Sequence, residues 1–159
     1  MKLAVLNASP LIVLARAGYL GLVPKLVSSA VVPRAVATEV TAGPAEDPAV
    51  RFLAKPSWLT VVDLTPPLSP LAIWRLGQGE SEVLEYARRN PGTTAVLDDK
   101  ATRRAALALH IPLTGTLGLL VAAAKSELLP SLRDAIDTVR ACGLYVDPDT
   151  ASALIEGER

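Results

Sequence analysis

Residues 4–18 read AVLNASPLIVLARAG, and the change of periodicity within this stretch decides the fold class. A short apolar run, typical of a buried strand, ends at Asn7, and apolar residues then recur at helical spacing. We expect Ser9 to cap that helix, with Pro10 at its first position and Gly18 after its end. Asn7 would then lie at the carboxyl end of a strand, where open α/β sheets form their sites.

Similar apolar runs recur along the chain and alternate with helical segments. This alternation predicts a three-layer α/β/α domain, in which helices cover both faces of a central, mostly parallel sheet. No internal repeat is visible, and TPPLSP (65–70) is too short to separate domains, so residues 1–159 are expected to form one domain. Strands are expected within residues 3–6, 29–32, 58–64, 93–99 and 111–115, and helices within residues 9–17, 20–27, 33–43, 45–54, 77–90, 100–110, 116–129, 130–143 and 147–158.

Composition excludes several classes of function. The chain has 16 basic and 16 acidic residues, so its zero net charge gives no overall attraction to nucleic acid. The single cysteine, Cys142, excludes an intramolecular disulfide and a zinc site built from several cysteines. The apolar N-terminal run is too interrupted for a signal peptide, and no segment has the ~20 apolar residues needed to span a bilayer. We therefore expect a cytoplasmic protein without a membrane segment.

Carboxylates are the strongest candidates for chemistry, because the chain lacks G-x-S-x-G, G-x-x-x-x-G-K-[ST] and G-x-G-x-x-G motifs. Glu39 lies among apolar residues of a predicted helix, and Glu80 lies at the start of another. Asp98 and Asp99 end a predicted strand. Oxygen ligands of this kind suit Mg²⁺ or Mn²⁺, and two such ions could activate water for phosphodiester hydrolysis. The alternative is that Glu80 and Asp99 only cap helices.

Four segments together resemble a known family, the PIN-domain superfamily, and in particular the DUF3368 group of small bacterial and archaeal proteins. They are LNASPLIVLARAGYLGLV (6–23), VVPRAVATEV (31–40), GQGESEVLEYA (77–87) and AVLDDKATRRAALALHIPLTGTLGLLVAAAKSELL (95–129). The most specific parts are G-E-x-E-x-x and L-D-D-K-x-x-R-R followed by G-T-L-G-L-L. The resemblance extends from Leu3 to about Glu158. It implies a Mg²⁺- or Mn²⁺-dependent ribonuclease, and many such proteins are toxins of toxin–antitoxin pairs.

The resemblance also implies roles for individual acidic positions. Asn7 stands where the family pattern has Asp, at the end of the first strand. Glu39 and Glu80 match the second and third acidic positions. Asp99 matches the fourth, with Asp98 as an adjacent ligand or supporting group. These five residues are the expected catalytic set, and the four carboxylates are the expected metal ligands.

Asn7 is the one departure from that pattern. An amide offers a carbonyl oxygen but no negative charge, and it cannot act as a general base. The substitution is an introduced inactivating change, a natural loss of activity, or a tolerated change that lowers activity. Three functions therefore stay open: a PIN-type endoribonuclease, a catalytically inactive PIN-like module that binds nucleic acid or protein, and a subunit that only assembles with a partner.

Contacts with RNA are expected from cations and hydroxyl groups near the acidic positions. Lys100, Arg103 and Arg104 directly follow the two aspartates, although charged side chains also occur on ordinary solvated helix faces. Ser9 and Thr116 match hydroxyl positions of the family, although each could simply cap a helix. The mean hydropathy of +0.36 and the apolar residues 117–129 suggest a homodimer face, and the resemblance suggests a small antitoxin partner.

Overall fold

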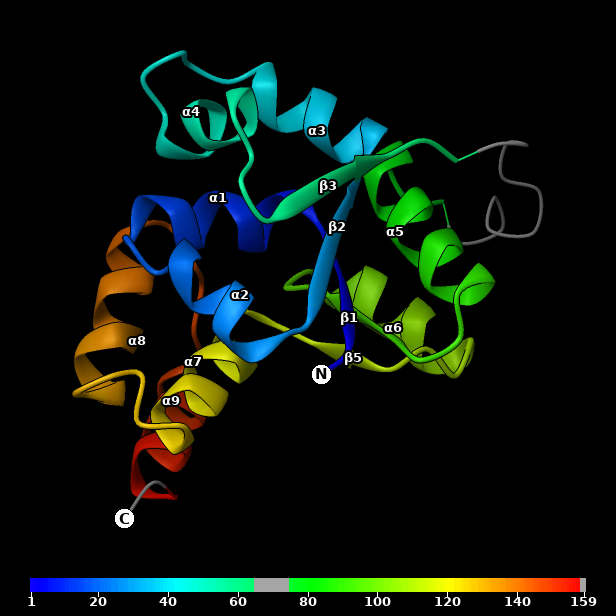
Figure 1. The fold of residues 1–159 in the computed structure, drawn as a ribbon. Coiled ribbons are helices and arrows are strands. Elements are labelled where there is room, and N and C mark those ends of the chain that lie inside the picture. Colours follow the sequence, from blue (N-terminus) through cyan, green and yellow to red (C-terminus); the bar gives the residue numbers. More distant parts are fainter. Residues whose placement is uncertain (65–74, 158–159) are drawn as a thin grey trace.

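The computed structural model of the protein describes residues 1–64 and 75–157, and its centre is a five-stranded parallel sheet in the order β3-β2-β1-β4-β5. Figure 1 shows helices on both sides of this sheet, so the predicted α/β/α architecture is confirmed. The strands are β1 (Leu3–Leu6), β2 (Ser29–Pro33), β3 (Leu59–Val62), β4 (Thr93–Val96) and β5 (Leu113–Thr114). The helices are α1 (Ala8–Arg16), η1 (Leu20–Leu22), α2 (Val23–Leu26), α3 (Arg34–Thr41), α4 (Pro48–Ala54), α5 (Gln78–Arg89), α6 (Lys100–Ala108), α7 (Thr116–Lys125), α8 (Leu132–Ala141) and α9 (Pro148–Glu156).

The first strand of the chain, β1, lies at the centre of the sheet between β2 and β4. Its residues Val5 and Leu6 are fully buried, as expected for a strand that is covered on both faces. The chain passes from β1 to β2 on one side and later returns to β4 on the other, so the strand order reverses at β1. Ligand sites of open parallel sheets form at the carboxyl ends of the strands beside such a reversal. Asn7 directly follows β1 at that edge.

The two faces of the sheet are covered by different sets of helices. On one side α5 packs on β1, β2 and β4, and α6 packs on β5. On the other side α1 contacts α7 and α8, and α7 also contacts α2 (Figure 1). The side chains in the core are almost entirely Ala, Val, Leu and Ile, because the chain has few aromatic residues. In the described ranges no helix is long and apolar enough to cross a membrane.

One buried charge belongs to the fold and lies within α5. Glu85 is only 1% exposed, and its carboxylate accepts hydrogen bonds from Arg88 Nη2 at 2.7 Å and Arg89 Nε at 2.6 Å. The Arg88 hydrogen bonds lower the pKa of Glu85 most strongly, burial opposes them, and Arg89 adds to the lowering. This ion-pair network fixes the carboxyl-terminal end of α5.

Two of the helix caps that the sequence suggests are formed by other residues in the structure. Asn7, not Ser9, occupies the position before α1, and its side chain makes no capping bond. Gly115, not Thr116, precedes α7. Both hydroxyl side chains are therefore inside the first turn of a helix, where they are available for contacts across the sheet edge. The segment TPPLSP (65–70) lies outside the described residues.

Candidate active site

Asp98 is held by contacts from two other elements at the carboxyl edge of the sheet. The backbone N–H of Thr116 donates to its Oδ1 at 2.8 Å, and the Thr116 hydroxyl donates to its Oδ2 at 2.7 Å. The hydroxyl of Ser9, on α1, contacts the same Oδ2 at a longer 3.5 Å. Thr116 is completely buried, whereas Asp98 is partly exposed towards a pocket that it lines. The carboxylate of Asp98 therefore has a fixed orientation between the ends of β4 and β5.

Asp99, the next residue, has a different task. It caps α6: its Oδ2 accepts from the backbone N–H of Thr102 at 2.8 Å and from the Thr102 hydroxyl at 2.9 Å. The Thr102 backbone N–H is the largest cause that holds the pKa of Asp99 below its ordinary value of 3.8; burial opposes this, and the charge of Arg104 adds a smaller lowering. Of the two adjacent aspartates, Asp98 faces Ser9 and Thr116, and Asp99 stabilises a helix.

Asn7 occupies the strand end next to Asp98. Its backbone N–H donates to Val96 O at 3.2 Å, which continues the pairing of β1 with β4. The residue is 5% exposed, and its side-chain Oδ1 is buried without a hydrogen-bond partner. A buried carbonyl oxygen that lacks a donor costs about 1–3 kcal/mol. An oxygen of this kind is also a ligand that hard divalent cations accept.

A second acidic cleft lies between α3 and α5, with a volume of about 420 Å³. Glu39 and Glu82 both line it. Glu82 accepts the backbone N–H of Ala35 at 3.1 Å through Oε2. Gly79 allows the two helices to approach, because a Cβ atom at that position would lie 3.0 Å from Glu39 Oε2. This cleft lies at the β2 side of the edge, across β1 from Asp98.

Glu80 does not face this cleft. Its Oε2 accepts the backbone N–H of Gly77 at 2.7 Å, which closes a capping interaction at the start of α5. Sequence reasoning selected Glu80 and missed Glu82, although both belong to the G-E-x-E segment. Residues two positions apart on a helix point in nearly opposite directions, at about 100° per residue. Only the packing of α5 against α3 shows which of the two glutamates lines the cleft.

The acidic groups follow the edge of the sheet and do not gather at one point. Among residues 1–64 and 75–157, no three His, Cys, Asp or Glu side chains lie close enough to hold one metal ion. Mg²⁺ commonly uses only one or two protein carboxylates and fills its other positions with water and phosphate oxygens. The carboxylate of Asp98 and the donor-free carbonyl oxygen of Asn7 fit such a sparse site better than a preformed two-ion site.

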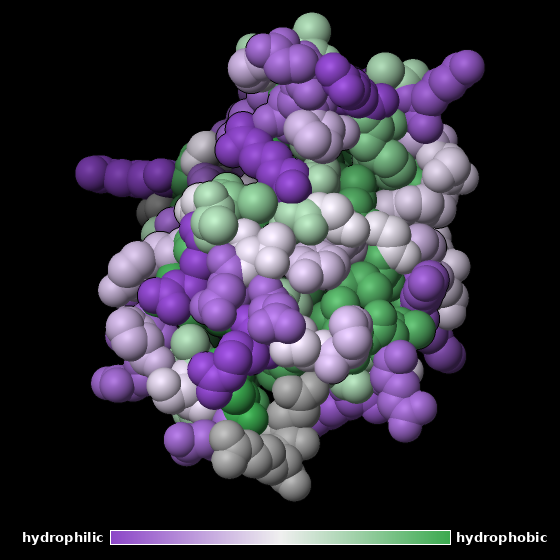
Figure 2. Space-filling view, turned by 90° about the vertical axis from the view of Figure 1, so that its left-hand side faces the viewer, coloured by the Kyte–Doolittle hydropathy of each residue, from purple (hydrophilic) through white to green (hydrophobic). Residues whose placement is uncertain are grey.

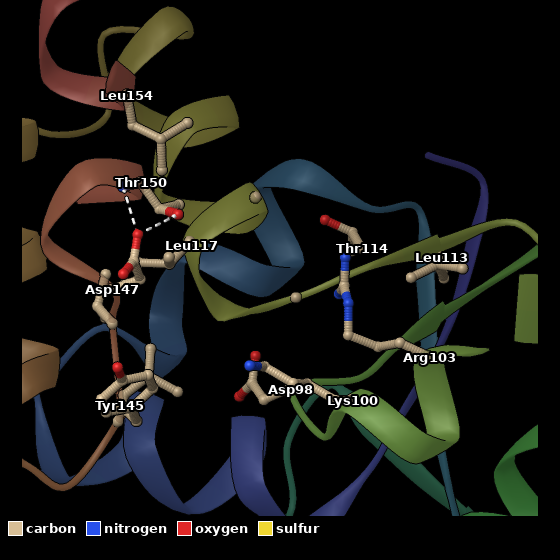
Figure 3. A pocket seen from close by; sticks show the side chains of 14 residues that line it. Asp98, Lys100, Arg103, Leu113, Thr114, Leu117, Tyr145, Asp147, Thr150 and Leu154 are labelled. Carbon is tan, nitrogen blue, oxygen red and sulfur yellow. Dashed lines mark hydrogen bonds between the residues drawn. The ribbon is translucent and has the colours of Figure 1, made fainter. Parts of the chain in front are cut away.

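Two of the expected RNA-contacting cations lie beside Asp98. Lys100 and Arg103 line a pocket of about 680 Å³ that also includes Asp98, and Figure 3 shows these three side chains together on one side of it. Arg103 Nη1 donates to Leu97 O at 2.8 Å, which ties its guanidinium to the end of β4. Gly115 makes this arrangement possible, because a Cβ atom there would lie 2.9 Å from Asp98 Oδ1. Arg104 is exposed and lies outside the lining of this pocket.

The residues predicted to form a homodimer face are partly internal. Leu119, Leu120 and Ala123 of α7 are at most 1% exposed within the protein's own core. Figure 2 shows hydrophilic and apolar side chains interspersed on one face of the molecule. The homodimer and the antitoxin partner stay predictions.

Comparison with known proteins identifies a family for the chain. The model of the family DUF3368, described as a PIN domain, matches residues 3–157. No curated protein and no solved structure matches the chain. The match covers every strand of the sheet and all the acidic residues of the candidate site.

Proposed function

The chain belongs to the DUF3368 family of PIN domains, and from this premise we propose that it is a Mg²⁺- or Mn²⁺-dependent endoribonuclease whose activity is reduced by Asn7. One observation supports the proposal most strongly. Asp98 is held in a fixed orientation at the carboxyl edge of the sheet, one strand away from the buried, donor-free carbonyl oxygen of Asn7. An acid and an amide oxygen at neighbouring strand ends are suitable ligands for a hard cation.

The chemistry would be divided among a few side chains. A bound divalent ion would activate water and offset charge on the phosphate. Asp98 would hold the ion, and Thr116 would keep its carboxylate oriented. Glu39, which lines the cleft on the other side of Asn7, would accept one proton of the attacking water, and solvent would protonate the leaving ribose oxygen. Lys100 would attract the phosphates of the backbone.

Asn7 explains why we expect low activity in this chain. Its amide can donate an oxygen to a cation but contributes no charge, so the affinity for Mg²⁺ falls. The remaining direct carboxylate is Asp98. Restoring a carboxylate at position 7 is therefore the most informative change.

The test measures cleavage of single-stranded RNA in Mn²⁺ by four proteins: the chain as it stands, Asn7→Asp, Asn7→Asp/Asp98→Asn and Asn7→Asp/Asp99→Asn. We expect Asn7→Asp to cleave at least tenfold faster than the unchanged chain. Adding Asp98→Asn should abolish this gain, whereas Asp99→Asn should keep it, because Asn is also a good helix cap. If Asn7→Asp cleaves no RNA in Mn²⁺, the nuclease proposal fails. The reverse ranking of the two double variants would assign the ligand to Asp99.

A second function is favoured by the same amide. A PIN-like module that only binds nucleic acid or protein would need no charge at position 7. It predicts RNA binding without cleavage by both the unchanged chain and Asn7→Asp. Cleavage by the unchanged chain would exclude it.

The biological setting is also a proposal. If the protein is the toxin of a toxin–antitoxin pair, induced expression of Asn7→Asp should arrest growth of the host cells. Co-expression of the proposed antitoxin should relieve that arrest. Equal growth with Asn7→Asp and Asn7→Asp/Asp98→Asn would contradict a toxin role. Light scattering of the purified protein tests the homodimer.

A further inference from the structure

The pocket beside Asp98 continues well beyond the acidic edge of the sheet. Its volume is about 680 Å³, within the range of about 300–1,000 Å³ that is common for small-ligand sites. It lies between the start of α6, β5 and α7 on one side and the segment joining α8 to α9 on the other (Figure 3). We call it the Tyr145 pocket, and the side chains that the argument uses are Lys100, Leu113, Leu117, Leu144, Tyr145 and Leu154.

Apolar walls are the first notable feature of the Tyr145 pocket. Leu113 and Leu117 come from β5 and α7, and Leu144 and Leu154 come from the opposite side. All four are only partly buried. A planar apolar group that entered between them would remove this surface from water, which is favourable in proportion to the area covered.

Tyr145 is the second feature. Its side chain is 80% exposed, the highest value among the exposed large hydrophobic residues of the described chain. The other two, Met1 and Leu107, lie outside the Tyr145 pocket. Ordering an aromatic side chain loses little conformational entropy. Its exposed ring offers a face on which a nucleic-acid base can stack, a contact that contributes about 1–3 kcal/mol per base.

The charges are distributed unevenly around the Tyr145 pocket. Lys100 and Arg103 lie at the end next to Asp98, whereas Asp147 lies at the Tyr145 end (Figure 3). Asp147 Oδ2 is engaged in capping α9, where it accepts from the Thr150 backbone N–H at 3.0 Å and hydroxyl at 3.1 Å. A ligand with an anionic end and a planar apolar end would therefore place its anion near Lys100 and its planar group at Tyr145.

We propose that the Tyr145 pocket is a subsite for one unstacked base of a single-stranded RNA, adjacent to the phosphate at Asp98. The choice of RNA as the ligand rests on the proposed nuclease function. Tyr145 stacks on the base, the leucines enclose its edge, and Lys100 contacts the phosphate. A base inside a duplex is stacked on both faces and paired along one edge, so the Tyr145 pocket selects single strands over duplexes.

The test measures binding without divalent metal, so that cleavage does not enter the result. A fluorescein-labelled 12-nucleotide RNA, single-stranded or annealed to its complement, is titrated in EDTA with the unchanged chain, Tyr145→Ala, Tyr145→Phe, Lys100→Ala and Lys25→Ala. Lys25 is the matched control for Lys100: it is exposed on α2, directly before β2, at the opposite end of the sheet. Fluorescence anisotropy gives each dissociation constant.

We expect Tyr145→Ala to weaken single-strand binding roughly 5- to 30-fold, the equivalent of about 1–2 kcal/mol of lost stacking. Tyr145→Phe keeps the ring and should bind within about twofold of the unchanged chain. Lys100→Ala should weaken binding and Lys25→Ala should not. Equal binding by Tyr145→Ala and the unchanged chain, duplex binding as tight as single-strand binding, or no RNA binding at all overturns the subsite.

These results separate the subsite from the nuclease proposal. If Asn7→Asp never cleaves RNA but Tyr145→Ala still loses single-strand binding, the subsite stands and the nuclease fails. If Asn7→Asp cleaves RNA and Tyr145→Ala binds normally, the nuclease stands and the subsite fails. If the Tyr145 pocket instead receives a side chain of a partner protein, we expect this second outcome, in which Tyr145→Ala binds RNA normally.

Discussion

Thr116 contacts both carboxylate oxygens of Asp98, one through its backbone N–H and the other through its hydroxyl, although the two residues are 18 positions apart. The pair joins the end of β4 to the start of α7, and Thr116 is completely buried. A hydrogen bond to a charged group contributes more to stability than a hydrogen bond between two neutral groups. Orientation of Asp98 and stability of this edge therefore depend on the same contact.

Thr116→Val should lower the free energy of unfolding by about 1.5–3 kcal/mol, because it keeps the shape of the side chain and removes the donor to a carboxylate. Thr116→Ser keeps the hydroxyl and loses one methyl group, so its cost should be nearer about 1 kcal/mol. Urea titration followed by circular dichroism measures both. A Val variant as stable as the Ser variant would show that the hydroxyl bond is dispensable.

Asp99 should give the protein a pH-dependent component of stability. The pKa of Asp99 is lowered in the folded state. Its contribution to stability is therefore fully present above the pKa of the unfolded chain, and it is lost as the pH falls through the pKa of the folded state, which lies below 3.8. Asp99→Asn retains a capping side chain that does not titrate. The stability of this variant should therefore fall less steeply than that of the unchanged chain as the pH is lowered. Urea midpoints from pH 6 to pH 2 test this. Identical slopes for the two proteins would contradict the assignment.

Gly115→Ala should disturb the candidate site directly. The added Cβ atom would lie 2.9 Å from Asp98 Oδ1 and 3.0 Å from both Arg103 Nη1 and Leu97 O, closer than such atoms normally approach. We expect a loss of about 1–3 kcal/mol, the range for overpacked positions. Gly21→Ala is the matched control, because nothing lies within 4 Å of its added Cβ atom. Thermal unfolding of the two variants should differ clearly; equal midpoints would refute the crowding at Gly115.

Asn7→Asp should couple stability to divalent metal. Without metal the variant carries an additional buried carboxylate at the same sheet edge as Asp98, and its thermal midpoint should fall. Mn²⁺ at a hundred times its dissociation constant should restore about 2.7 kcal/mol. The unchanged chain should respond less, and Asn7→Asp/Asp98→Asn least. Equal Mn²⁺ responses of all three proteins would argue against a cation between these residues.

The Glu85 network should show the cost of an uncompensated buried charge. Arg88→Ala/Arg89→Ala leaves the 1% exposed carboxylate of Glu85 without either counter-charge. Adding Glu85→Leu removes that charge and fills its space with apolar atoms. The triple variant should therefore unfold at a higher urea concentration than the double variant. The opposite order would mean that Glu85 tolerates burial without these arginines.

Most of the fold could be predicted because local patterns determine it. Strand and helix periods differ, and every strand predicted from apolar runs is present within three residues of its expected bounds. The largest difference is in β4, which ends at Val96 and not at Asp99. The site was harder, because it depends on which way a side chain points after packing. Glu80 and Glu82 lie in one helix turn, and only the contact with α3 distinguishes them. Asp98 and Asp99 are adjacent in the segment between β4 and α6, and only the contact of Asp98 with the distant Thr116 distinguishes their roles.

The order of the strands along the chain differs from their order in the sheet. Because β1 is made first yet lies between β2 and β4, it has neighbours on both sides only after Val96 has been synthesised. The anchor of Asp98 comes later still, at Thr116. A nascent chain that ends before this threonine cannot assemble the edge, and neither can any amino-terminal fragment released early by the ribosome. Any ligand of this carboxyl edge therefore finds its site only after residues 1–116 have been synthesised and have folded together.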